Sequence, residues 1–387
     1  MVLPWDLVVA RPKTRRWRWL VPPVLVAILF TGYSVRDRIE ARAEPTLPER
    51  TPAEVAQMAA SPHPEPRSGF LELRTSLGLG DFGAATGESG GSLVGLASGN
   101  NDARLWQDGD RRRIALLEEL GETDWYRNGD VTYVWHSRRS RVTKVSNPTE
   151  QSSATGLITS LAGGGTIESP DGMAARFLAL RNENTRLVLH APKYVADRPA
   201  YQLGLVPETP TSLITEVTIG VDAATGLPLR VEVKTRSGTT AIDSKFTSVK
   251  FKRPSPSHFD FVPPPEANVT DGDTVPREPD YSDDWQRERD RERALEDVQS
   301  VTGVNETLLR LATTGEGWNE VVAVTGLDWW RLDDLGRTAK TVTGEYGTGQ
   351  LLETPVFSLL ILPGGRIVAG AVTQEGLESA AVEVASR

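Results

Sequence analysis

Cysteine is absent from this chain of 387 residues, and histidine occurs only four times. The absence of cysteine excludes disulfides, thiolate metal sites and an anchor built on a lipidated cysteine. The histidines are far apart in the sequence, at His63, His136, His190 and His258, so no two of them form a short-range pair of metal ligands. The sequence therefore predicts neither a metal site nor a cofactor.

The short motifs of common enzyme classes are also missing, among them G-x-S-x-G, H-E-x-x-H and the Walker phosphate loop. Carboxylates gather around one predicted turn, where Glu118, Glu119, Glu122 and Asp124 are expected on the solvated surface. A net charge of −9 argues against nucleic acid, which requires a basic face. We therefore predict no catalytic residue, no enzymatic activity and no nucleic-acid partner.

The chain is longer than a domain with a single hydrophobic core usually is, so two folded units with connectors are expected. The 35 glycines and 26 prolines favour short strands and turns over long helices. The predicted plan has five parts: a basic tail and membrane segment (1–35), a proline-rich tether with one short helix (36–67), a β-rich domain (68–265), a charged linker (266–300) and a small α+β module (301–387).

The N-terminal segment "WLVPPVLVAILFTGYSV" at 19–35 carries no charge and is just long enough for a thin or tilted membrane span. Five basic residues precede it, which predicts a cytoplasmic N-terminus and an extracytoplasmic main domain on a single-pass anchor in the cell membrane. Two alternatives stay open. One is a signal sequence cleaved near Ala43, which would release a secreted protein, and the other is a buried helix of a soluble protein.

The region 68–265 reads as a succession of β-hairpins. In "WYRNGDVTYVWHSRRSRVTKV", Asn128-Gly129 is a strong hairpin signal, and Tyr133 and Trp135 follow in a period-two strand. A helix capped near Ser169 or Asp171 separates this meander from a second one. In the last module, strands are expected around "NEVVAVTG" and "VFSLLILPGGRIVAGAVT", and helices at "NETLLRLATTG" and "EGLESAAVEVA". The predicted fold class is α+β.

The chain resembles the LolA/LolB-like superfamily of bacterial lipoprotein carriers, in the branch with the sigma-E regulatory RseB/MucB-like proteins. The resemblance covers about 68–265 and is carried by "RLWQDGDRRRIALLEELGETDWYRNGDVTYVW", "TRLVLHAPKYVADRPAYQLGLVPE", "VTIGVDAATGLPLRVEVKT" and "FTSVKFKRPSPSHFDFVPPP". It implies a curved antiparallel half-barrel, with helices that plug its concave side and an apolar concave face that receives acyl chains. Residues of the type needed for that face are Trp106, Ile114, Leu116, Tyr133, Trp135, Val188 and Leu203.

A group of arginines stands out in this acidic chain. Arg112, Arg138 and Arg139 are candidates to contact an anionic headgroup, and protection of a strand edge is the alternative reading. The resulting hypothesis is a membrane-anchored, extracytoplasmic protein that binds lipid or an acylated protein without catalysis. The alternative is a regulator, like the RseB-like branch, that binds an anti-sigma factor or another membrane protein.

Overall fold

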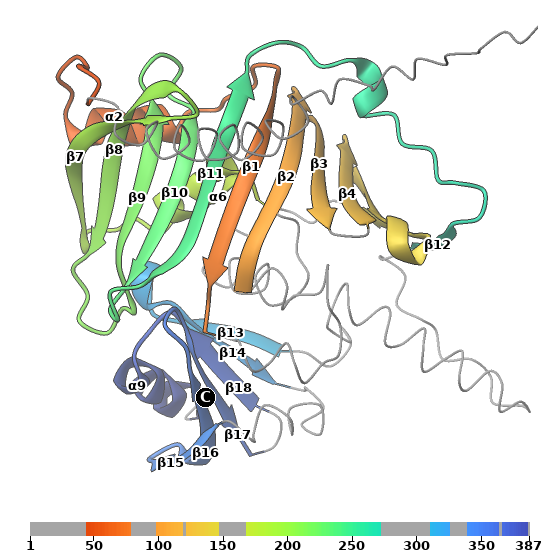
Figure 1. Cartoon of the computed structure of the whole chain (residues 1–387). Coiled ribbons are helices and arrows are strands. Elements are labelled where there is room, and N and C mark those ends of the chain that lie inside the picture. The colour runs from red at the N-terminus through yellow and green to blue at the C-terminus, as the bar shows by residue number, and fades with distance from the viewer. Residues whose placement is uncertain are drawn as a thin grey trace, which may run out of the picture. The chain divides into compact units, whose positions relative to one another are not determined.

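The computed structural model describes residues 44–78, 98–118, 121–146, 168–271, 310–325, 339–363 and 366–385. The chain divides into two compact units, Met1–Glu44 and Pro45–Arg387, and the elements below belong to the second. They form an α+β structure with two large, open and mostly antiparallel sheets (Figure 1). Among the described helices, none has the length and apolar character needed to span a bilayer. The predicted anchor at 19–35 lies outside the described residues.

The larger sheet has twelve strands in the order β12-β6-β5-β4-β3-β2-β1-β11-β10-β9-β8-β7. Its strands are β1 (Arg67–Ser76), β2 (Ser98–Asp108), β3 (Arg111–Glu118), β4 (Gly121–Asn128), β5 (Val131–His136), β6 (Arg141–Ser146), β7 (Thr185–Val195), β8 (Arg198–Pro207), β9 (Ile214–Asp222), β10 (Pro228–Thr235), β11 (Thr240–Lys250) and β12 (Asn268–Asp271). Two meanders, β2–β6 and β7–β11, are joined by β1. The predicted hairpins are confirmed, and β12 and β7 are the edges.

The turns follow from residues that tolerate positive φ. Gly129 (φ 61°) lies in the β4–β5 turn, as its pairing with Asn128 predicts. The β7–β8 turn is built differently, because Ala196 (φ 51°) and Asp197 (φ 60°) both adopt the left-handed region without being glycine. Flanking pairs of long strands fix that turn, and Val195 pairs directly with Arg198.

Helix α2 (Pro52–Ala60) lies within the segment predicted as a tether. Thr51 and Glu54 form a capping box, in which the Glu54 amide donates to the Thr51 hydroxyl at 3.2 Å and the Thr51 amide donates to the Glu54 carboxylate at 2.7 Å. The predicted short helix is therefore confirmed. Val55 and Ala56 are fully buried in the core of the large sheet, so from Thr51 onward this segment is part of the fold and not only a spacer.

Helix α6 (Pro170–Ala179) begins after Ser169, as the sequence predicts, with proline in the first turn. Its buried face, with Met173 and Phe177, packs chiefly on β10 and α2 and also on β11, whereas α2 packs on β7, β8 and β9 as well. Both helices share one apolar core with the strands, which includes Leu203 of β8. The short 3₁₀ helices η2 (Ser137–Arg139) and η3 (Pro256–His258) complete this region.

The smaller sheet has six strands in the order β13-β14-β18-β17-β16-β15. Its elements are β13 (Arg310–Thr314), η4 (Gly317–Asn319), β14 (Val321–Thr325), β15 (Lys340–Gly344), β16 (Gly347–Glu353), β17 (Ser358–Leu362), β18 (Arg366–Gly370) and α9 (Gln374–Ala385). The predicted strands and the terminal helix are confirmed. The helix expected at "NETLLRLATTG" is wrong over Arg310–Thr314, because these residues pair with β14 and include two β-branched threonines.

Candidate functional site

The register of the large sheet separates two faces, because directly paired residues on neighbouring strands lie on the same face. One row across β2–β5 consists of Leu105, Ile114, Trp125 and Val134. The neighbouring row, on the opposite face, consists of Trp106, Arg113, Tyr126 and Tyr133. Followed from strand to strand, the side of Leu105 is also the side of Leu203, against which α2 and α6 pack. We call it the inner face and the opposite side the outer face.

The seven residues proposed for one apolar ligand face are divided between these two faces. Those on the inner face are Ile114, Leu116 and Leu203, each at most 2% exposed. Those on the outer face are Trp106, Tyr133, Trp135 and Val188, all partly exposed. The structure therefore brings together two separate groups, and only the inner group shares a face with the helices.

The inner face of β1–β5 carries a continuous apolar surface. Its buried members are Leu71, Ala103, Leu105, Ile114, Leu116 and Trp125, and Val134 packs beside them. Trp125 is the residue that the sequence reasoning missed. Its signal was the pairing with Val134, which the Asn128-Gly129 turn fixes once that turn is placed. Helices α2 and α6 make their main contacts with the other half of the sheet, from β7 to β11.

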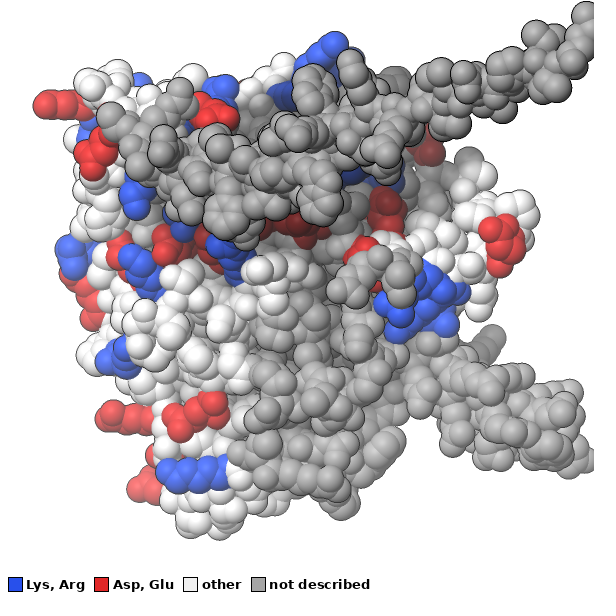
Figure 2. All heavy atoms as spheres, in the orientation of Figure 1, with Lys and Arg blue, Asp and Glu red and all other residues white. Residues whose placement is uncertain are grey.

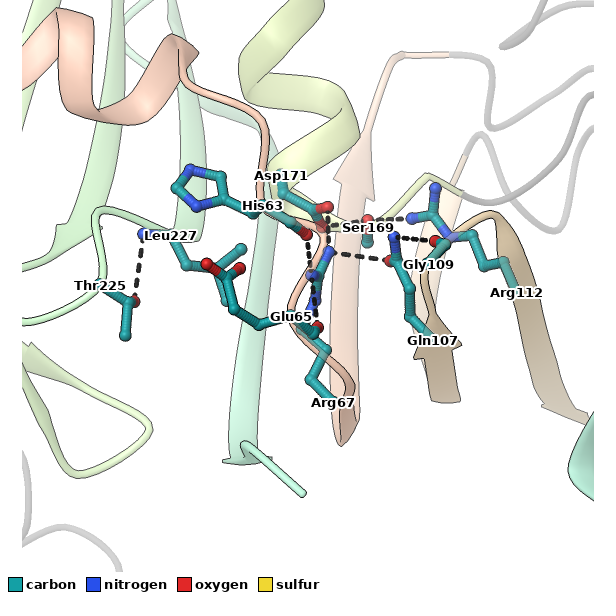
Figure 3. Close-up of polar contacts among 10 residues, drawn as sticks. All are labelled: His63, Glu65, Arg67, Gln107, Gly109, Arg112, Ser169, Asp171, Thr225 and Leu227. Carbon is teal, nitrogen blue, oxygen red and sulfur yellow. Dashed lines mark hydrogen bonds and ion pairs between the residues drawn. The ribbon is translucent and has the colours of Figure 1, made fainter. Parts of the chain in front are cut away.

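A buried polar network lies beside this apolar surface, at the start of α6 (Figure 3). Arg67, 1% exposed, donates to the Asp171 carboxylate at 2.5 Å, to the Gln107 side chain at 2.8 Å and to the His63 carbonyl at 2.7 Å. From β3, Arg112 donates to the Ser169 hydroxyl, which in turn donates to Asp171. Two cations thus converge on one carboxylate.

The surrounding groups favour the ionised form of Asp171 over its protonated form. Burial alone would raise the pKa of Asp171, but Arg112, Arg67 and the Ser169 hydroxyl hold that pKa below its ordinary value. Burial lowers the pKa of Arg67 and also that of His63. The Nε atoms of Arg67 and Arg112 are buried without a hydrogen-bond partner. The favourable charge interaction of the two arginines in this network is therefore mainly that with Asp171.

The three arginines proposed for headgroup contact do not form one group. Arg112 is bound to Ser169 at one end of β3, whereas Arg138 and Arg139 are exposed in η2 at the other end of the strands. Figure 2 shows blue side chains gathered where Figure 1 has η2. The side chain of Arg138 packs against Gly121, whose absent Cβ would lie 2.4 Å from the Arg138 Cγ atom. Arg138 therefore lies beside the inner-face end of β4.

On the outer face, Arg113 is enclosed by aromatic rings and acids. Its guanidinium carbon lies 4.9 Å from the Trp106 ring centroid and 4.7 Å from that of Tyr126. Its Nε donates to Asp124 at 2.7 Å and its Nη2 to Glu122 at 3.0 Å. Burial raises the pKa of Asp124 to about 7 despite Arg113, with a further contribution from Glu122. The expected solvated position of Asp124 is wrong, because its side chain is 3% exposed.

The described part of the chain supplies no metal site. Over its ranges, no group of three or more histidines, aspartates and glutamates is placed to hold a metal ion. The carboxylates that gather near the β3–β4 turn have partners in the protein, Arg113 for Asp124 and the Thr123 hydroxyl for Glu118. Chemically, the described residues offer apolar side chains on the inner face, aromatic side chains on the outer face and a buried ion network.

No family model and no curated protein matches the sequence. Among solved structures, the chain is similar to the MucA/MucB complex of Pseudomonas aeruginosa, with 14% identity, a TM-score of 0.40, and coverage of 85% of this chain and 95% of that chain. An uncharacterized conserved protein from Thermus thermophilus matches with 10% identity, a TM-score of 0.35, and 57% and 99% coverage. A LolA superfamily protein from Nitrosomonas europaea matches with 11% identity, a TM-score of 0.23, and 55% and 99% coverage. The matched structures thus include both kinds of protein that the sequence resembles.

Proposed function

We propose that this protein binds an acyl chain of a lipid or lipoprotein, without catalysis, on the inner face of β1–β5. The observation that carries the proposal is the row of apolar side chains from Leu71 to Trp125, which lies beyond the main contacts of α2 and α6. These side chains are at most 6% exposed, so an acyl chain would take the place of the groups that cover them in the structure. An acyl chain suits such a surface, because it is linear and has no hydrogen-bonding groups to satisfy.

The energy available on such a face is sufficient for retention. Burial of each methylene contributes about 0.8 kcal/mol, so a chain of about a dozen methylenes would gain on the order of 10 kcal/mol before the costs of association. Leu105, Ile114 and Leu116 are at most 2% exposed without a ligand, so part of this energy would be spent on displacing the groups that cover them.

The anchor and the headgroup contacts complete this proposal. An uncleaved membrane segment at 19–35 would hold the domain on the outer side of the cell membrane and limit it to sensing or handover there. Arg138 and Arg139 would meet an anionic headgroup, because Arg138 lies at the end of the inner face where Gly121 makes room for its stem. Arg112 is excluded from this role by its contact with Ser169.

The experiment is native mass spectrometry of residues 44–387, purified gently, before and after organic extraction. We expect an extra mass of lipid size that extraction removes. Leu116→Gln, on the inner face, should lose this mass, and Leu117→Gln, its outward neighbour at 37% exposure, should keep it. Circular dichroism checks that both variants fold. A wild-type chain that carries no lipid and takes up none when lipid is added would overturn the proposal.

A second candidate function is a regulator that binds the external segment of an anti-sigma factor or another membrane protein. It is favoured by the β6 edge of the large sheet, where the four-residue strand β12 is the only pairing partner among the described residues. Exposed sheet edges accept extended segments of other proteins. Capture from membranes with the full chain as bait tests this candidate, and recovery of no membrane protein, with or without added lipid, would count against it.

A further inference from the structure

Residues 251–271, which we call the strap, run from the end of β11 across the outer face to the β6 edge. The strap ends in β12, which pairs in parallel with β6 from Asn268 opposite Arg141 to Asp271 opposite Lys144. The Asn268 amide also donates to the carbonyl of Ser140 at 2.8 Å. The strap thus covers part of the outer face and also pairs with the β6 edge of the sheet.

Aromatic side chains hold the strap on the outer face. His258 stacks on Trp106 with ring centroids 4.9 Å apart, and Phe261 stacks on Tyr126 at 4.6 Å. Phe261 also meets the rings of Tyr133 at 5.6 Å and Trp135 at 6.4 Å. Three of the residues that the sequence singled out as ligand contacts, Trp106, Tyr133 and Trp135, therefore bind a segment of their own chain.

The backbone of the strap contributes little to this hold before β12 begins. The amides of His258, Phe259 and Ala267 donate to carbonyls within the strap itself. Val262 is 80% exposed and Val269 is 53% exposed, whereas Phe259 is 3% exposed, so the strap lies on the surface with one ring buried. Its attachment consists of ring contacts, the ion pair of Arg253 with Asp108 at 3.6 Å and four strand pairs, and another chain that offers the same groups can replace it.

We propose that the outer face from Trp106 to Trp135, together with the β6 edge, is a peptide-binding surface that the strap occupies in cis. The occupant from outside is an extended, acidic, proline-rich segment of a partner protein with an aromatic residue in the place of Phe261. This inference rests on the second candidate function, a protein partner, and is independent of lipid on the inner face.

The chemistry of the partner follows from the strap and the surface beneath it. Between Ser257 and Asp271 the strap carries three acids, three prolines in succession and no lysine or arginine. Beneath it, Arg113 lies between two rings and Arg111 under the ring of Phe259, 5.0 Å from its centroid. Both arginines are already paired with acids of the sheet, so the acidic character of the partner is inferred from the strap itself. Prolines keep a segment extended, and aromatic grooves bind such segments at low entropic cost.

The test uses the full chain and a labelled synthetic peptide of residues 256–271, PSHFDFVPPPEANVTD. In the wild type, the tethered strap competes at an effective concentration of roughly millimolar, so the peptide should bind weakly. Phe261→Ala loosens the strap and should bind the peptide at least tenfold more tightly. Val262→Ala, at a position 80% exposed, is the matched control and should behave as the wild type. A peptide that itself carries Phe261→Ala should not bind.

A second variant keeps the proposal falsifiable without removing any ring contact. Val142 and Val269 are direct partners across β6 and β12, and the chain has no cysteine of its own. Val142→Cys with Val269→Cys should form a disulfide, because strand neighbours roughly 5 Å apart suit that bond. The oxidised form should bind no peptide, even with Phe261→Ala added, and reduction should restore binding.

The outcomes separate this inference from the candidate function beneath it. Phe261→Ala that folds but binds the peptide no better than the wild type overturns the peptide-binding surface. Equal binding by the oxidised and reduced forms also overturns it. If the oxidised chain captures a membrane protein as well as the reduced chain does, the partner uses another surface, and the second candidate function survives while this inference fails.

Discussion

Trp318 of η4, between β13 and β14, stacks on Phe177 of helix α6, with ring centroids 6.1 Å apart and planes inclined by 14°. Trp318 is 3% exposed, and its indole N–H donates to the Thr185 hydroxyl at 2.8 Å. Both rings belong to the core that α2, α6 and the large sheet share. Helix α6 is therefore held at its first turn by Arg67 and near its last turn by Trp318, in the connection between two strands of the smaller sheet.

Trp318→Ala should destabilise the unit by about 3–5 kcal/mol, because it leaves a cavity beside Phe177. Trp318→Phe keeps the stacking but loses the hydrogen bond to Thr185. It should cost only about 1 kcal/mol for that bond, in addition to the cost of the smaller ring volume. Urea unfolding followed by circular dichroism measures both free energies of unfolding. Equal losses in the two variants would show that the stack contributes nothing.

Asp171→Asn should destabilise the protein by about 3–5 kcal/mol, because the buried Arg67 and the partly buried Arg112 would lose their shared counter-charge. The matched control is Glu208→Gln, which removes one acid from the exposed Arg186–Glu208 pair and should cost at most about 1 kcal/mol. Denaturant unfolding of both variants gives the comparison. A loss at Asp171 no larger than that at Glu208 would contradict the assigned role of the network.

Gly172→Ala in α6 should stabilise the protein by up to about 1 kcal/mol, because alanine reduces the freedom of the unfolded chain and favours the helix. The added Cβ would meet nothing closer than 3.9 Å, at Glu168. Gly376→Ala in α9 is the matched case, where the new Cβ would lie 3.0 Å from the Thr211 Cβ atom. It should not stabilise. Thermal unfolding distinguishes the two, and an equal gain at both sites would refute the packing of α9 on Thr211.

Local signals were enough to predict the hairpins of both sheets. Asn128-Gly129 and the glycines after Pro363 predict turns, and the alternation of apolar and polar residues on either side predicts the strands. Ser169 and Pro170 likewise mark the start of α6. These features depend on residues within a few positions of one another, so one sequence contains them completely.

The division of residues between two faces could not be predicted in the same way. Strand β5 is apolar on both sides, with Tyr133 and Trp135 outward and Val134 inward, and every one of its residues is of intermediate exposure. Periodicity assigns a face only when one side is polar. The outward aromatic side chains are covered by Phe261. That contact joins residues more than a hundred positions apart, so the local sequence does not show it.

Burial against other elements explains the other differences. The proline-rich composition of 36–67 favours a spacer, yet Val55 is buried against strands far along the chain. Asp124 follows a predicted turn and is expected in solvent, yet it is 3% exposed and paired with Arg113 on the neighbouring strand. In both cases, a segment that its sequence predicts to be exposed is buried because a partner on another element satisfies it.

Asp124 should make the stability of the protein fall as pH rises. Burial raises the pKa of its carboxyl from 3.8 to about 7, so the folded state keeps a proton that the unfolded state releases above about pH 4. The contribution of this group is fully present below about pH 4 and is lost as pH rises through about 7. Burial lowers the pKa values of His63 and His136, and their contributions run in the opposite direction.

Asp124→Asn isolates the carboxyl from these histidines, because the amide stays neutral at every pH while the histidines are common to both proteins. Since one pKa unit corresponds to about 1.4 kcal/mol, the free energy of unfolding of the wild type relative to Asp124→Asn should fall by roughly 2–4 kcal/mol between pH 4.5 and 7.5. Urea unfolding of both proteins at several pH values in this range measures it. Parallel pH profiles would mean that Asp124 is ionised throughout, and that its pairing with Arg113 outweighs its burial.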